Sequence, residues 1–89
     1  MPKQELELTI LTPQKNIFKG PVEALKVPAD KGYLGILVNH APLICLLKNG
    51  HITARTKDQT LNFTTTGGLM EVLDNKVTIL ADDAQAVTA

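Results

Sequence analysis

Short extended segments recur along this chain every eight to twelve residues or so, and turn residues separate them. The first is typical, because residues 5–10 alternate strictly between polar and apolar side chains, which is the period of a half-buried strand. We therefore expect Leu6, Leu8 and Ile10 to point inward. Segments before Asp82 lack helical periodicity. This pattern predicts an all-β fold, either a sandwich or a barrel.

Glycine and asparagine mark several joints between the strands. Asn49-Gly50 is a strong signal for a two-residue hairpin, because both residue types tolerate a positive φ. Asp74-Asn75 predicts another two-residue turn, and Gly67-Gly68 predicts a sharp joint. Between Ala24 and Leu25 the alternation slips by one residue, which indicates a bulge or a strand that passes between two sheets.

The most irregular stretch is Gly32–Leu43, where an apolar strand ends at Asn39-His40 and another begins beyond Pro42. Proline donates no ladder hydrogen bond and biases the residue before it toward an extended conformation, so this corner lies at a strand end. A histidine on such a rigid corner can face a substrate, a metal or another protein. The following segment, Leu43–Leu47, is apolar throughout, which predicts that both of its faces are covered.

The end of the chain has a different pattern. Residues 82–86, Asp-Asp-Ala-Gln-Ala, are typical of a helix N-cap followed by good helix formers. The few residues that follow are too few for a stable isolated helix. We therefore expect one β-sandwich domain over residues 1–83 and a short tail over 84–89 that starts a helix but forms no helical domain.

Composition excludes several classes of function. Nine Lys and Arg balance nine Asp and Glu, so the chain has no broad electrostatic attraction for nucleic acid or acidic lipid. Aromatic residues make up only 3%, too few for stacking on single strands. The single cysteine, Cys45, forms no internal disulfide and fits a reducing compartment. The longest apolar run is far shorter than the ~18 residues of a membrane span, so we expect contact with a membrane only through a partner.

The residue types that perform chemistry do not form a recognisable set. Cys45 lies within an apolar run, which favours a packing thiol over a nucleophile paired with His40. Two histidines and one cysteine without paired spacing do not predict a metal site. We expect a non-catalytic protein without a cofactor that docks through its rigid joints.

Two alternatives belong to other classes of function. One is a small all-β carrier domain whose Lys31 is modified on the turn over residues 28–32. The other is a generic barrel that binds oligosaccharide or nucleic acid, which the low aromatic count and neutral charge disfavour.

Several motifs, in one order and at one spacing, resemble the epsilon subunit of the bacterial and chloroplast F-type ATP synthase. The resemblance extends from Leu6 to Asp83. It is carried by Leu11-Thr12-Pro13, Phe18 with Gly20 and Val22-Glu23, Gly32 with Gly35-Ile36-Leu37, Asn39-His40-Ala41-Pro42-Leu43, Gly67-Gly68 with Glu71-Val72, and Lys76–Asp82.

The resemblance implies a two-layer β-sandwich of about ten short strands in two five-stranded sheets, at the foot of the rotating central stalk. Members of this family bind the gamma subunit with one face and the polar loops of the membrane-embedded c-ring with one end. They couple proton transport to ATP synthesis and catalyse no reaction themselves. A peripheral subunit on the cytoplasmic face of the bacterial inner membrane is implied, which meets the membrane only through the complex.

The resemblance also implies site residues. The residues on the gamma side are Thr12, His40, Cys45, Thr66 and Gly67. The residues on the c-ring side form the turn Ala29, Asp30, Lys31, Gly32 and Tyr33. Many relatives carry an acidic residue at the position of Tyr33, so we expect stacking or hydrogen bonding by the phenol to replace a charge contact there.

Typical members of the family continue into two helices that can block ATP hydrolysis and that bind ATP in some members. The present sequence ends at Ala89. We therefore expect neither helix-mediated inhibition nor nucleotide binding.

Overall fold

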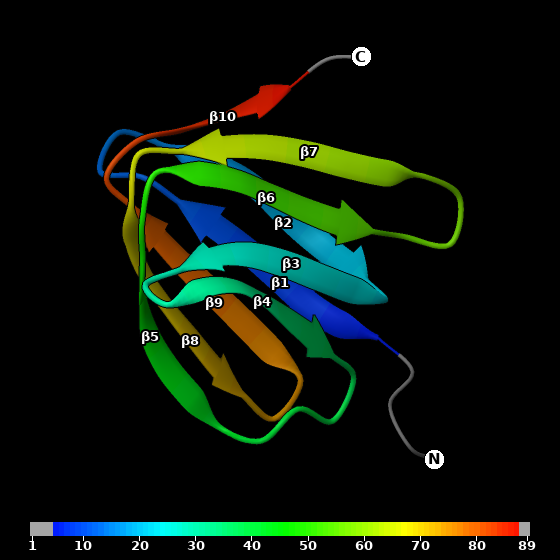
Figure 1. Ribbon diagram of the computed structural model, residues 1–89. Coiled ribbons are helices and arrows are strands. Elements are labelled where there is room, and N and C mark those ends of the chain that lie inside the picture. Colours follow the sequence, from blue (N-terminus) through cyan, green and yellow to red (C-terminus); the bar gives the residue numbers. More distant parts are fainter. Residues whose placement is uncertain (1–4, 88–89) are drawn as a thin grey trace.

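The computed structural model describes residues 5–87, and within this range it contains strands and no helix (Figure 1). The predicted all-β class is confirmed. No described residue belongs to a helix that is long and apolar enough to cross a membrane. In chain order the strands are β1 (Leu6–Leu11), β2 (Asn16–Val22), β3 (Ala24–Ala29), β4 (Gly32–Leu37), β5 (Leu43–Leu47), β6 (Gly50–Arg55), β7 (Thr60–Thr65), β8 (Gly68–Leu73), β9 (Lys76–Ala81) and β10 (Ala84–Val87).

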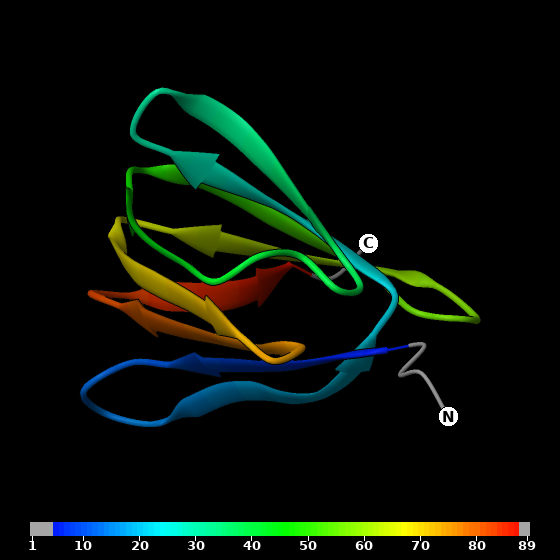
Figure 2. The ribbon, with the colours of Figure 1, turned by 90° about the horizontal axis from the view of Figure 1, so that it is seen from below.

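The strands form two layers, which we call sheet I (β4-β3-β6-β7-β10) and sheet II (β5-β8-β9-β1-β2). Hydrogen-bonded pairing passes from one sheet to the other through a single residue pair, Ala29 of β3 and Leu47 of β5. Figure 2 shows β3 and β4 on one side of the molecule and β1 and β2 on the other. The predicted β-sandwich of two five-stranded sheets is confirmed.

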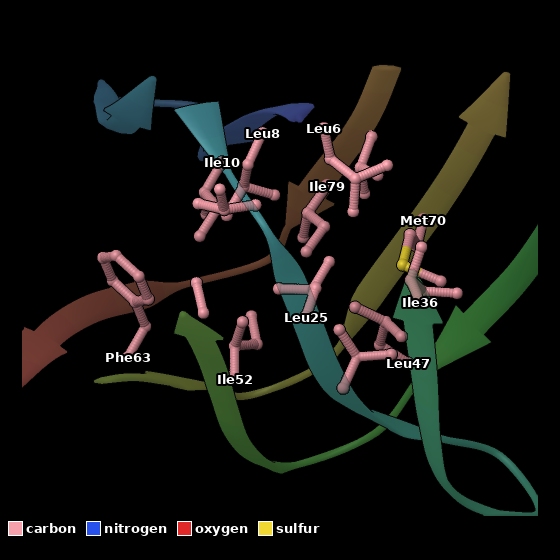
Figure 3. Packing of buried hydrophobic residues seen from close by; sticks show 14 of the residues in the cluster. Leu6, Leu8, Ile10, Leu25, Ile36, Leu47, Ile52, Phe63, Met70 and Ile79 are labelled. Carbon is pink, nitrogen blue, oxygen red and sulfur yellow. The ribbon is translucent and has the colours of Figure 1, made fainter. Parts of the chain in front are cut away.

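The core lies between the two sheets and follows from the alternation of each strand. Leu6, Leu8 and Ile10 of β1 are completely buried, as predicted. Side chains from both sheets point toward one another in this layer (Figure 3). Burying each large aliphatic side chain contributes about 1.5–3 kcal/mol, so this layer supplies most of the stabilisation of a small domain. At the edge of the layer, the rings of Phe18 and Phe63 pack with centroids 5.6 Å apart.

Two of the crossings between the sheets are tight joints. At Glu23 the chain leaves β2 of sheet II and enters β3 of sheet I, so the slip in alternation does mark a strand that changes sheet. The second joint is Gly67-Gly68, between β7 and β8, where φ is 133° and 151°. A Cβ atom at Gly68 would overlap the carbonyl oxygen of Leu80, so this position requires glycine.

The prediction of a hairpin at Asn49-Gly50 is wrong. The strands on either side, β5 and β6, belong to different sheets, and the chain crosses between them here. Glycine at position 50 instead lets the backbone lie close to the side chain of Pro28, because a Cβ atom there would lie 2.7 Å from the Cβ of Pro28. The turn predicted over residues 28–32 is also shorter than expected, since Pro28 is buried within β3 and only Asp30-Lys31 lie outside the strands.

The helix start predicted over residues 82–86 is wrong as well. Ala84–Val87 forms strand β10, which pairs antiparallel with β7 and extends sheet I beyond Asp83. Ala84 is buried in the core, and the edge of β7 offers backbone partners along the whole segment. Burial and strand pairing therefore outweigh the local helix propensity of alanine and glutamine.

Candidate functional site

The outer face of sheet II exposes apolar side chains where the sequence predicts a covered strand. In β5, Ile44 is 64% exposed and Leu46 is 63% exposed, whereas Leu47 is buried. The expectation that both faces of β5 are covered is therefore wrong within the described chain. One face of the strand packs on the core, and the other lies open to a partner.

The strand register places three leucines side by side on this face. Leu46 of β5 lies opposite Leu69 of β8, and Leu69 lies opposite Leu80 of β9. Neighbouring strands are about 4.8 Å apart, so the three side chains form a continuous row across the sheet. We call the exposed apolar set on this side of sheet II the leucine face, and it comprises Ile44, Leu46, Leu69, Leu73 and Leu80. A grouped apolar surface of this kind marks a site of interaction.

The opposite side of the molecule has a different character. The outer face of sheet I carries Lys26, Thr53, Arg55 and Asn62, and the hydroxyl of Thr53 donates to Oδ1 of Asn62 at 3.3 Å. The same face also exposes Tyr33 and Leu37, so it is mixed in character. The continuous row of leucines lies only on sheet II.

Thr12, Thr66 and Gly67, predicted for the gamma side, lie at one end of the sandwich. The loops that join β1 to β2, β3 to β4 and β7 to β8 lie together at the left of Figure 1. Gly67 is fixed there because its N–H donates to Oγ1 of Thr65 at 3.1 Å and its carbonyl accepts from the N–H of Asp82 at 2.9 Å. A shallow hollow lined in part by Asp30, Thr66 and Gly67 connects this end to the leucine face.

His40 lies at the other end of sheet II, in the corner between β4 and β5 (Figure 1). Its N–H donates to the carbonyl of Leu37 at 3.1 Å, and its Nδ1 lies 2.7 Å from the carbonyl oxygen of Ala41. The structure therefore does not bring His40 together with Thr66 and Gly67. The leucine face lies between the two ends.

Cys45 is half-buried and belongs to the inner side of β5, between the exposed Ile44 and Leu46. Desolvation raises the pKa of its thiol, which favours the neutral packing form over a nucleophilic thiolate. The thiol lines an apolar pocket of about 430 Å³ together with the turn that includes Asp30 and Tyr33. In space, Cys45 is thus close to residues predicted for the c-ring side.

The predicted c-ring turn is held by contacts on both sides. The N–H of Asp30 donates to the carbonyl of Leu46 at 3.2 Å, and Gly32 takes a φ of 125°. Tyr33 is 54% exposed, and its hydroxyl accepts a hydrogen bond from the N–H of His51 at 3.2 Å. Nζ of Lys26 lies 5.3 Å from the centroid of the Tyr33 ring, in a cation–π geometry.

Within residues 5–87, no group of three or more His, Cys, Asp or Glu is arranged to hold a metal ion. The features that the sequence reasoning missed are apolar: Ile44, Leu46, Leu69 and Leu80. The sequence did contain a signal for an exposed apolar face, because residues 43–47 are apolar at the positions that point to either side of the strand. Such a run fits an outer face that a partner covers as well as a strand buried within its own domain.

Comparison with known proteins identifies close sequence relatives. Residues 5–87 match the family described as ATP synthase, delta/epsilon chain, β-sandwich domain. The ATP synthase epsilon chain of Pelotomaculum thermopropionicum is 46% identical over 78 residues, which are 88% of this chain and 58% of the relative. The ATP synthase epsilon chain of Leptospira borgpetersenii is 41% identical over 78 residues, or 88% of this chain and 61% of the relative. The chain thus spans about three fifths of the length of these curated relatives.

Solved structures agree with this match. A chain in the central stalk and c-ring structure of the Tetrahymena thermophila mitochondrial ATP synthase superposes with a TM-score of 0.76 at 26% identity, covering 94% of this chain and 68% of that chain. A chain in the Euglena gracilis mitochondrial ATP synthase gives a TM-score of 0.89 at 21% identity, over 97% of this chain and 56% of that chain, and shows the same fold.

Proposed function

Because the chain belongs to the family of ATP synthase delta/epsilon chain β-sandwich domains, we propose that it is an epsilon-type subunit of the rotor of a proton-translocating F-type ATP synthase. In this role it links the gamma subunit to the c-ring and couples proton transport to ATP synthesis. It catalyses no reaction and is peripheral to the membrane part of the complex. The bacterial relatives support a position at the cytoplasmic face of the inner membrane.

The leucine face is the observation that carries this proposal. Sheet II already packs one side on the core, so its exposed leucines gain burial only against another molecule. Each large aliphatic side chain that becomes buried contributes about 1.5–3 kcal/mol. We assign this face to the gamma subunit. His40 lies at one end of the face, and Thr12, Thr66 and Gly67 lie at the other. Cys45 supports the face from its inner side.

The turn Ala29–Tyr33 is assigned to the c-ring. It lies at the same end of the sandwich as Thr66 and Gly67, and its Asp30 and Lys31 are exposed. The hydroxyl of Tyr33 accepts a hydrogen bond from the N–H of His51, which leaves its own proton free for an acceptor on the partner. A polar loop that presents a carbonyl or carboxylate oxygen would satisfy this donor. The carrier alternative needs an exposed Lys31, which is present, but the family match does not favour it.

A pair of matched substitutions tests the assignment of the leucine face. Leu46 on sheet II and Leu37 on sheet I are 63% and 62% exposed, so Leu→Ser removes similar apolar surface at both positions. Calorimetry with purified gamma subunit should show that L46S weakens binding by about tenfold or more, as expected for the loss of one buried apolar side chain. L37S should change the affinity by less than about twofold.

Equal effects of the two substitutions would remove the leucine face as the gamma site. Failure of the unaltered chain to bind gamma at micromolar concentration would contradict the proposed function itself.

A further inference from the structure

Two asparagines that are distant in the sequence form a reciprocal pair. The N–H of Asn39 donates to Oδ1 of Asn75 at 2.6 Å, and Nδ2 of Asn75 donates to Oδ1 of Asn39 at 3.1 Å. Both residues have a left-handed backbone, with φ of 69° and 62°. Asparagine is one of the few residue types that adopt this conformation readily. The pair connects the corner between β4 and β5 to the turn between β8 and β9.

Asn75 also contacts a third element. Its carbonyl accepts a hydrogen bond from the N–H of Glu7, near the start of β1. The main chain of Asn75 thus joins the β8–β9 turn to β1, and its side chain joins the corner to the same turn. Both β1 and the strands of the turn are fixed in sheet II by strand pairing.

We propose that Asn75 is a positioning residue, whose side chain holds the Asn39–Pro42 corner so that His40 is presented at the end of the leucine face. The inference rests on the proposed function, because the partner that His40 would meet is the gamma subunit. The bond that His40 N–H makes to the carbonyl of Leu37 connects the corner to the end of β4 in sheet I and not to sheet II. Without the amide pair the corner samples more conformations, and binding then includes the entropy of ordering them.

Substitutions at Asn75 distinguish the contribution of its side-chain amide from that of the backbone conformation of the turn. N75G keeps the positive φ and the carbonyl that accepts from Glu7, and it removes the amide. N75D keeps an acceptor for the Asn39 N–H but replaces the donor, so we expect an intermediate effect. The matched control is D74G, which removes an exposed side chain from the same turn at a φ of 50°.

The first measurement uses the chain alone. Amide hydrogen exchange at Asn39 should accelerate by about tenfold in N75G, as expected for the loss of one well-formed hydrogen bond. D74G should leave exchange at Asn39 unchanged to within about twofold. Unaltered protection of Asn39 in N75G, or equal acceleration in D74G, would overturn the inference.

The second measurement is the affinity for purified gamma subunit. N75G should weaken binding by about tenfold, and D74G by less than about twofold. In an H40A background N75G should add less than about twofold, because both residues act through the same corner. The same loss in both backgrounds would overturn the positioning role. If the unaltered chain does not bind gamma, the proposed function fails, and the exchange measurement still decides whether Asn75 holds the corner.

Discussion

Gly68 shows how strictly a single residue constrains this fold. Its φ of 151° and the adjacent carbonyl of Leu80 leave no room for a side chain. The sequence indicates a sharp joint at Gly67-Gly68, but it does not indicate which atoms a Cβ would meet. That information depends on β9, which pairs with β8 across the sheet.

Gly68→Ala should lower the free energy of unfolding by about 2–4 kcal/mol, through backbone strain and overlap with Leu80. Gly35→Ala is the control, since an added Cβ there meets no atom within 4 Å. It should change stability by less than about 1 kcal/mol. Urea denaturation measures both effects, and equal stability of the two variants would contradict the argument.

The thiol of Cys45 gives a prediction about pH. Burial raises its pKa, so the folded state favours the neutral thiol. The stabilisation is complete below the pKa of the unfolded chain and is lost as the pH rises through the folded-state pKa. At neutral pH a disulfide reagent should react more slowly with the folded chain than with the urea-unfolded chain. Equal rates would mean that Cys45 is not shielded.

At the scale of elements, local pattern predicts strands well where one face is buried. The alternation of residues 5–10 gives β1 and its three inward side chains correctly. It fails at β5, because an apolar run does not distinguish cover by the domain from cover by a partner. It also fails at residues 82–86, where the edge of β7 determines the conformation of β10. The irregular positions predicted to carry the site residues lie in loops and turns, as expected. Tertiary structure decides that Thr12, Thr66 and Gly67 lie at one end of the sandwich and His40 at the other.

Two neighbouring residues of β10 test its strand phase, because successive side chains of a strand point to opposite faces of the sheet. Ala84 is buried in the core and Gln85 is exposed. Ala84→Asp should destabilise the protein by about 2–4 kcal/mol, because it buries an unpaired charge. Gln85→Asp should remain within about 0.5 kcal/mol of the original chain. Thermal unfolding followed by circular dichroism compares them, and similar melting temperatures would refute the strand assignment.

At the scale of the whole molecule, the continuous row of leucines lies on one side only of a chain with a formal net charge of zero. Neither the balance of charge nor the low aromatic content indicates this asymmetry. It arises from register, since Leu46, Leu69 and Leu80 become neighbours only when β5, β8 and β9 are aligned.

Binding of gamma to an apolar face should depend little on salt. We expect the affinity to change by less than about threefold between 50 mM and 500 mM salt, because screening acts on charged contacts. The heat capacity change of binding should be negative, as for burial of apolar surface. Calorimetry at several temperatures and ionic strengths measures both. A steep loss of affinity with salt would indicate a charged interface instead.

The parallel pairing of β1 with β9 determines when the protein can fold. Glu7 of β1 lies opposite Lys76 of β9, so β1 can pair with β9 only after most of the chain has been synthesised. During synthesis, sheet II therefore remains incomplete until β9 has left the ribosome. Contacts so distant in sequence slow folding, and until they form, the apolar residues of β1 are exposed to chaperones and to other nascent chains.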